Sequence, residues 1–111
     1  MYDEREGDVV DYLETLLPED WSTWDLDKRV DYFRQRDVLT PKERVGTVPR
    51  AKVSVVEIFC ECFGRPKNYM TRKDTDEIIS IMARIPGWER PAGATQRSKA
   101  YGKQRVFIRI G

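Results

Sequence analysis

Residues 71–109 read TRKDTDEIISIMARIPGWERPAGATQRSKAYGKQRVFIR, and the rest of the chain can be arranged around this segment. Thr71 and Asp74 have the spacing of a capping box, which predicts the first turn of a helix. That helix has one apolar face at helical spacing, made of Ile78, Ile81, Met82 and Ile85. Pro86 and Gly87 are poor helix residues and predict a turn directly after it.

After the turn, the sequence predicts two strands joined by a polar loop. In the second strand, three aliphatic residues alternate with two arginines and a phenylalanine. The aliphatic residues are Val106, Ile108 and Ile110, and the others are Arg105, Phe107 and Arg109. This period-2 pattern is typical of a half-buried ribbon. A helix followed directly by a basic ribbon is the layout of a winged helix. The expected fold class is therefore α+β, a helix-turn-helix with a two-stranded β-wing, preceded by a short two-helix extension.

A further helix is predicted upstream, because Ser54 and Glu57 also have capping-box spacing and Gly64 can end the helix. Its buried face is expected to hold Val55, Ile58, Phe59 and Cys62. The side chains expected to face water are those of Ser54, Glu57 and Glu61. A full winged helix has three helices. The middle one is either the short turn Lys67–Met70, which we favour, or is replaced by a rearrangement that involves residues 25–36.

The first 48 residues form a different segment. Apolar periodicity predicts two short amphipathic helices there, at residues 8–17 and 24–36. The polar stretch that follows contains Pro41, Gly46 and Pro49, which mark a boundary. We therefore expect an acidic helical extension or linker over residues 1–48 and the winged-helix domain over residues 49–111.

The two segments differ in charge. Residues 1–48 hold thirteen acids and seven bases, whereas residues 49–111 hold six acids and thirteen bases. No acidic residue follows Glu89. Such asymmetry indicates a basic contact surface on the second segment. The plain alternative is a solvated hairpin that happens to be basic.

Lysine and arginine contacts to phosphates supply most non-specific DNA affinity. The candidate nucleic-acid-binding residues are Arg72, Lys73, Arg84, Arg97, Lys99, Tyr101, Lys103 and Arg105. The hairpin is the stronger part of this set, because the acids Asp76 and Glu77 can pair with the two helix cations four residues before them. Tyr101 could stack on a base, whereas Trp88 is better interpreted as a lid on the core.

Motifs of catalysis are missing from the sequence. It has no glycine-rich phosphate loop, no Walker lysine and no histidine. We therefore expect that this chain alone is not an enzyme and holds no cofactor or metal ion. Cys60 and Cys62 are expected to be reduced packing residues. No apolar run approaches the ~18–20 residues that span a membrane, so a cytoplasmic protein without membrane contact is expected.

Several short runs together resemble one family. They are VEIFCECFG at 56–64, MTR at 70–72, IPGWE at 85–89 and YGKQR at 101–105. These runs resemble the C-terminal end of virulence-associated protein E family proteins. LLPEDW at 16–21 is similar to the linker that those proteins carry just before it. The resemblance covers most of the chain, and its motifs are packing and turn residues.

Proteins of this family are encoded by phages, prophages and pathogenicity islands, and they resemble primase–helicases with a P-loop ATPase domain. The resemblance implies that this chain is the winged-helix region after such a domain. Its expected partners are the upstream ATPase domain and DNA, duplex or forked, contacted through the wing with low sequence specificity. The alternative is a protein-interaction or oligomerisation module of the same replication protein, which docks on the ATPase domain or forms a homo-oligomer.

Overall fold

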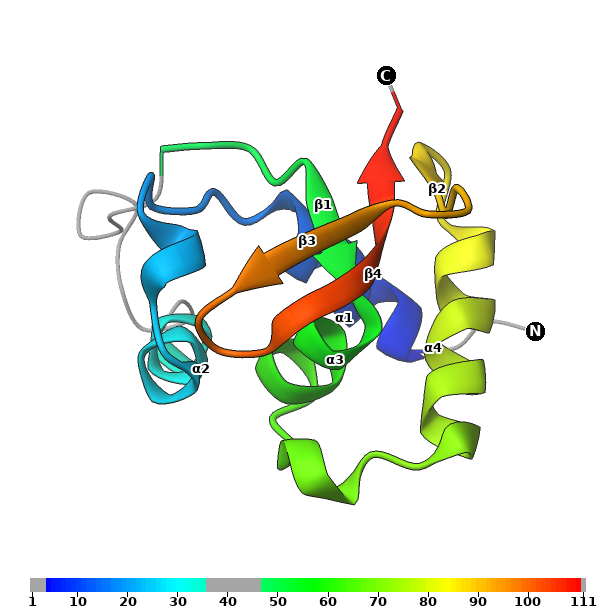
Figure 1. Ribbon diagram of the computed structural model, residues 1–111. Coiled ribbons are helices and arrows are strands. Elements are labelled where there is room, and N and C mark those ends of the chain that lie inside the picture. The colour runs from blue at the N-terminus through cyan, green and yellow to red at the C-terminus, as the bar shows by residue number, and fades with distance from the viewer. Residues whose placement is uncertain (1–3, 36–46, 111) are drawn as a thin grey trace.

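The computed structural model describes residues 4–35 and 47–110 (Figure 1). The elements follow one another as α1 Glu4–Glu14, η1 Trp21–Thr23, α2 Leu26–Gln35, β1 Lys52–Ser54, α3 Val55–Glu57, η3 Ile58–Cys62, η4 Lys67–Tyr69, α4 Arg72–Arg84, β2 Trp88–Glu89, β3 Thr95–Ser98 and β4 Gly102–Arg109. The segment η3 is a π-helix that continues α3, and η1 and η4 are single 3-10 turns. The fold is α+β. No helix in the described ranges is long and apolar enough to cross a membrane.

Strand β4 is the centre of a four-stranded antiparallel sheet. Its C-terminal half lies between β1 and β2, with Val53 opposite Phe107 and Trp88 opposite Arg109. Its N-terminal half pairs with β3 to form a hairpin. Helices α1, α2 and α4 all pack against η3, so α3–η3 is the central helical segment of the molecule. Figure 1 shows α1 and α3 behind the sheet and α4 along one side.

One hydrophobic core joins the two predicted segments. Tyr12 and Leu13 of α1 and Phe33 of α2 belong to the same buried cluster as Ile58 of η3 and Phe107 of β4. The described part of residues 1–48 therefore packs onto the rest of the chain. Its proposed role as a linker to an upstream domain stays a prediction, and part of the predicted boundary, residues 36–46, lies outside the described residues.

The local signals around α4 are confirmed. Thr71 caps the helix through a capping box, in which the Asp74 carboxylate accepts a hydrogen bond from the Thr71 backbone N–H at 2.9 Å. The predicted apolar face is buried: Ile78, Ile81, Met82 and Ile85. The chain then turns at Gly87, whose φ is +90°, a conformation that favours glycine. The predicted turn before α4 is also present, as η4.

The helices of the N-terminal segment are displaced from their predicted positions. Helix α1 covers Glu4–Glu14 rather than residues 8–17, and Leu17 instead forms a bridge with Val48. Helix α2 begins at Leu26 rather than at residue 24, because Trp24 is the extended residue that ends η1 and the Asp25 carboxylate accepts a hydrogen bond from the Lys28 backbone N–H at 2.9 Å.

The expectation that Ser54, Glu57 and Glu61 face water is wrong. All three side chains are buried, with residue exposures of 1%, 1% and 5%. Helices α1, α2 and α4 pack around α3–η3, and arginines from elsewhere in the chain neutralise the two carboxylates.

The predicted alternation in β4 is also incomplete. Val106 and Phe107 point to opposite faces of the strand and are both buried, so both faces are covered here, with the Arg90 guanidinium carbon 5.4 Å from the Phe107 ring centroid. Ile110 is 44% exposed and lies beyond the strand end. Trp88 is partly buried against the core, and the Arg109 guanidinium carbon lies 4.7 Å from its ring centroid.

Ile78→Val should lower the free energy of unfolding by about 0.5–1.5 kcal/mol, because it removes one methylene from a side chain that is 1% exposed. The matched control is Ile79→Val, the same change one residue along at a partly exposed position. It should cost less than about 0.5 kcal/mol in urea unfolding. Equal losses for the two variants would contradict the described orientation of α4.

Candidate nucleic-acid interface and its buried anchor

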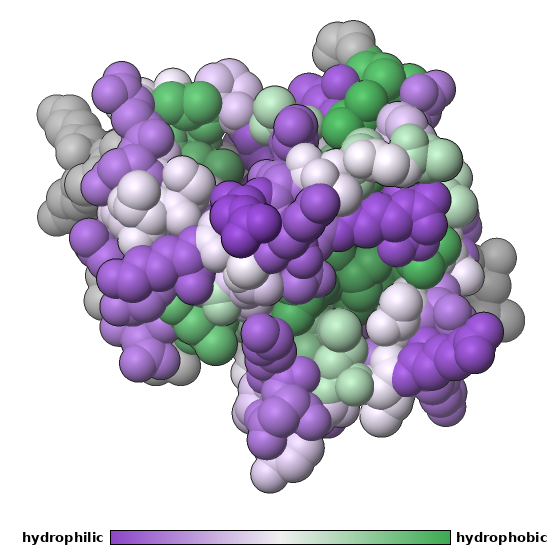
Figure 2. Space-filling model, in the orientation of Figure 1, coloured by the Kyte–Doolittle hydropathy of each residue, from purple (hydrophilic) through white to green (hydrophobic). Residues whose placement is uncertain are grey.

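The cations of the β3–β4 hairpin share one face. Arg97 lies opposite Lys103, and Thr95 lies opposite Arg105. All four residues are exposed. Residues two apart on a strand lie on the same face, so the register places Arg97, Lys103 and Arg105 together. We call these three residues the outer face of the hairpin. In Figure 2, hydrophilic side chains gather over this region.

The opposite face of the hairpin is fixed to the body of the protein. Gln96 Nε2 donates to Glu57 Oε1 at 2.6 Å. On the same face, the Gln104 amide donates to the Tyr101 carbonyl at 2.9 Å, a bond within the hairpin itself. At the turn, the Lys99 backbone N–H donates to the Ser22 carbonyl at 3.0 Å. The outer face therefore points away from the body, with the exposed Lys99 side chain at its end.

The outer face carries positive charge without a counter-charge. In the part of the chain that the structure describes, Arg97, Lys99, Lys103 and Arg105 make no ion pair with an acid. Arg97 and Lys103 also lie directly opposite each other, and like charges in that position destabilise a strand pair. An anion that lies against this face would relieve the repulsion between the two side chains.

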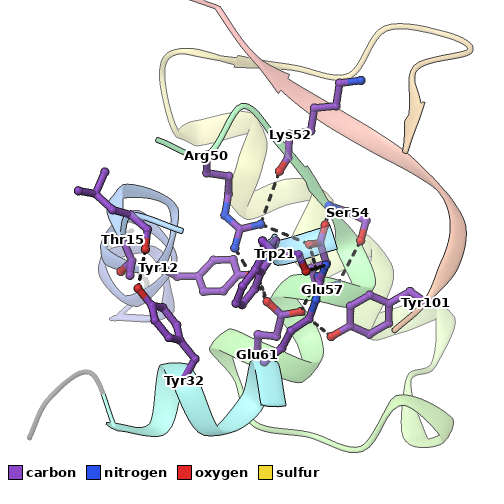
Figure 3. Close-up of polar contacts among 12 residues, drawn as sticks. Tyr12, Thr15, Trp21, Tyr32, Arg50, Lys52, Ser54, Glu57, Glu61 and Tyr101 are labelled. Atoms are coloured by element: carbon purple, nitrogen blue, oxygen red, sulfur yellow. Dashed lines mark hydrogen bonds and ion pairs between the residues drawn. The ribbon is translucent and has the colours of Figure 1, made fainter. Parts of the chain in front are cut away.

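Beneath the hairpin lies a group of buried charges, Arg29, Arg50, Glu57 and Glu61, which we call the buried charge cluster (Figure 3). Arg29 Nη1 lies 2.9 Å from Glu57 Oε2 and 3.3 Å from Glu61 Oε2. Arg50 Nη1 lies 3.4 Å from Glu57 Oε2. All four side chains are at most 1% exposed. The two positive and two negative charges balance, as buried charges must.

Aromatic residues complete the buried charge cluster. Glu61 accepts hydrogen bonds from the hydroxyl groups of Tyr12 at 2.8 Å and Tyr101 at 2.6 Å. The guanidinium carbon of Arg29 lies 4.5 Å from the Trp21 ring centroid, and that of Arg50 lies 4.5 Å from the Tyr12 ring. The cluster thus joins α1, η1, α2, η3 and the hairpin turn at one point (Figure 3).

Burial sets the protonation of the groups around Glu61. It raises the pKa of both Tyr12 and Tyr101, so these hydroxyls stay protonated and donate to the carboxylate. Burial and then the charge of Glu61 raise the pKa of Cys60 to about 11, so its thiol is protonated at neutral pH and is a poor nucleophile. The two tyrosine hydroxyls therefore serve as hydrogen-bond donors to Glu61.

The candidate residues on α4 are placed differently from those on the hairpin. Arg72 and Lys73 are exposed in its first turn. Arg84 instead forms an ion pair with Glu6 of α1. The predicted pairing of Lys73 with Glu77 is replaced, because the Glu77 carboxylate lies 3.0 Å from Arg5 Nη1. Two ion pairs from α1 thus lie along α4.

Tyr101 does not occupy the position expected of a stacking platform. The residue is 5% exposed, and its ring centroid lies 5.5 Å from the Arg29 guanidinium carbon and 5.9 Å from Lys67 Nζ. It belongs to the buried charge cluster, where its hydroxyl holds Glu61. Gly102, which directly follows it in the hairpin turn, has a φ of +71°, a conformation that favours glycine.

Comparisons with known proteins do not assign the chain to a protein family. No protein-family model matches the chain, and a search of the curated proteins found no significant match. Within the described ranges, no three histidine, cysteine, aspartate or glutamate side chains are close enough to hold a metal ion.

Proposed function

We propose that this chain is a DNA-binding winged-helix module that contacts phosphates mainly through the outer face of the hairpin. The observation that carries the proposal is the alignment of Arg97, Lys103 and Arg105 on one exposed face without a paired acid. Cations in such a row neutralise phosphates and release their counterions. Backbone contacts of this kind position a protein on DNA but read no sequence, so low sequence specificity follows.

The order of the elements supports a winged-helix interpretation. Helix α2, strand β1, helices α3–η3 and α4, and the hairpin follow one another, and β1 pairs with β4 beside β2. In this interpretation α3–η3 is the middle helix, and the short η4 turn that we favoured from the sequence is only the connection to α4. Helix α4 then takes the place of the recognition helix. Its ion pairs with α1 make it a weaker contact than the hairpin.

We further propose that the module belongs to a phage-type primase–helicase of the virulence-associated protein E family, after an upstream ATPase domain, in the cytoplasm. The support is the resemblance of the runs at 56–64, 85–89 and 101–105. In the structure these runs form the central helix, the turn into β2 and the return of the hairpin. The family motifs therefore lie at the elements that shape the domain and orient the hairpin.

The second candidate function is protein interaction or oligomerisation within the same replication protein. The observation that favours it is a set of exposed large apolar side chains: Val10, Leu16, Val48, Tyr69 and Ile110. Light scattering and a pull-down against the upstream ATPase domain discriminate between the two functions. A monomer without affinity for that domain would count against this second function.

The DNA-binding proposal predicts a salt-dependent affinity that falls when hairpin cations are removed. In fluorescence anisotropy, Arg97→Ala/Lys99→Ala should reduce the slope of log K against log salt on duplex DNA by about 0.9 for each cation removed. Lys73→Ala/Arg84→Ala should reduce it less, because Arg84 already pairs with Glu6. Lack of binding to duplex, forked and single-stranded DNA at about 50 mM salt would overturn the proposal.

A further inference from the structure

Arg90 extends the outer face of the hairpin toward β2. Glu89 lies opposite Ile108, so the same register continued by one residue places Arg90 opposite Phe107. Its guanidinium carbon lies 5.4 Å from the Phe107 ring centroid. Residues 105 and 107 share a face of β4, so Arg90 is a diagonal neighbour of Arg105.

Arg90 lacks a partner for its charge and for one of its donors. Its Nε atom is buried and makes no hydrogen bond to any residue that the structure describes. No acid in the described ranges forms an ion pair with it. Burial, and then the charge of Arg105, lower the pKa of Arg90, which means that its charged form is destabilised where it stands. An anion between the two arginines would relieve both the repulsion and the lack of partners.

We infer that Arg90 and Arg105 together form an anion site that binds one phosphate group of a nucleic-acid backbone. This inference rests on the proposed DNA-binding function and adds a residue that was not among its candidate contacts. Guanidinium groups bind phosphate through two parallel N–H donors, and packing on an aromatic ring holds such a group in place before the ligand arrives. Phe107 supplies that ring for Arg90.

The position of this anion site defines a track for the backbone. Lys103 and Arg105 are two residues apart on β4, a separation of about 7 Å along a strand. Arg90 lies opposite residue 107, which is two residues beyond Arg105 along β4. Bound DNA would then run along β4 from the hairpin turn toward the end of β2, which Arg90 directly follows.

The test compares Arg90→Gln with Arg65→Gln, which removes the same charge from an exposed arginine near another aromatic ring. Arg65 lies 5.9 Å from the Phe59 ring centroid, outside the hairpin. In salt titrations on duplex DNA, Arg90→Gln should reduce the slope by about 0.9, and Arg65→Gln should leave it unchanged. Arg90→Lys keeps the charge and should keep the slope but weaken binding several-fold. If the Arg90→Gln variant does not fold, the loss of affinity in Arg90→Lys tests the site in its place.

The Arg90 Nε–H resonance gives a direct second readout. In nuclear magnetic resonance spectra of the whole chain, it should shift on addition of duplex DNA and, at millimolar concentration, of inorganic phosphate. If the wild type binds DNA while Arg90→Gln keeps the full slope and the resonance does not move, the anion site is wrong and the proposed function stands. If phosphate moves the resonance but no DNA binds, the nucleic-acid ligand is wrong along with the proposed function.

Discussion

Glu61→Gln should lower the free energy of unfolding by about 3–5 kcal/mol, the cost typical of removing one partner from a buried ion pair. The side chain of Glu61 is fully buried beside Arg29 and accepts hydrogen bonds from Tyr12 and Tyr101. Glutamine keeps the volume but removes the negative charge, which leaves Arg29 and Arg50 with a single carboxylate. Its amide group also brings N–H donors to a place where neighbouring groups donate.

Urea unfolding of wild type and variant measures this loss. The matched control is Glu77→Gln, because Glu77 has an exposed ion pair with Arg5, with side-chain exposures of 36% and 46%. Exposed pairs contribute about 0–1 kcal/mol, so the control should unfold close to wild type. If Glu61→Gln does not fold, Tyr101→Phe removes one donor to the same carboxylate and should cost about 1.5–3 kcal/mol. Near-neutral effects of both changes would mean that Glu61 is hydrated and not paired.

The buried charge cluster also connects stability to the proposed DNA contact. Gln96 and Tyr101, on either side of the hairpin turn, both donate to its carboxylates. Arg29 brings α2 to the same carboxylates. The orientation of the outer face therefore depends on acids that lie beneath it and on a helix from the N-terminal segment.

Local signals in the sequence were sufficient to predict the helices and turns at the centre of the chain. Capping boxes at Ser54 and Thr71 are present as predicted, because the residues that form them are only three apart. The burial of Glu57 could not be predicted in that way. Its partner Arg29 is 28 residues away in the sequence, and only the packing of α2 against η3 brings them together. From a local sequence window, a carboxylate on a helix is predicted to be exposed, because the window does not contain the distant arginine that allows it to be buried.

The candidate site shows the same division between local and distant information. The absence of acids after Glu89 pointed to the hairpin, and the register then placed its cations on one face. Tyr101 was misplaced because its partner, Glu61, is 40 residues away. Arg90 was missed because it becomes a neighbour of Arg105 only through the pairing of β2 with β4. Pairing between distant strands has no signature in a local sequence window.

Lys103→Glu/Arg105→Glu should weaken duplex DNA binding by on the order of a hundredfold, because each change removes a phosphate contact and adds repulsion. The same variant should unfold at an equal or higher urea concentration than wild type. Arg97 lies opposite residue 103, so the change converts a like-charge pair across the strands into an opposite-charge pair. Such cross-strand pairs contribute roughly 0.2–1 kcal/mol.

Weaker DNA binding together with unchanged or higher stability is expected if the cations on this surface repel one another in the free protein and contact phosphates in the complex. The control is Lys99→Glu, an exposed cation at the hairpin turn, outside the β3–β4 register. It should weaken DNA binding by less than the double variant and should leave stability within about 0.5 kcal/mol of wild type. If the double variant binds DNA as tightly as wild type, the outer face is only a solvated basic surface. In that case the five exposed apolar side chains, and with them the interaction-module function, become the better explanation of what this chain does.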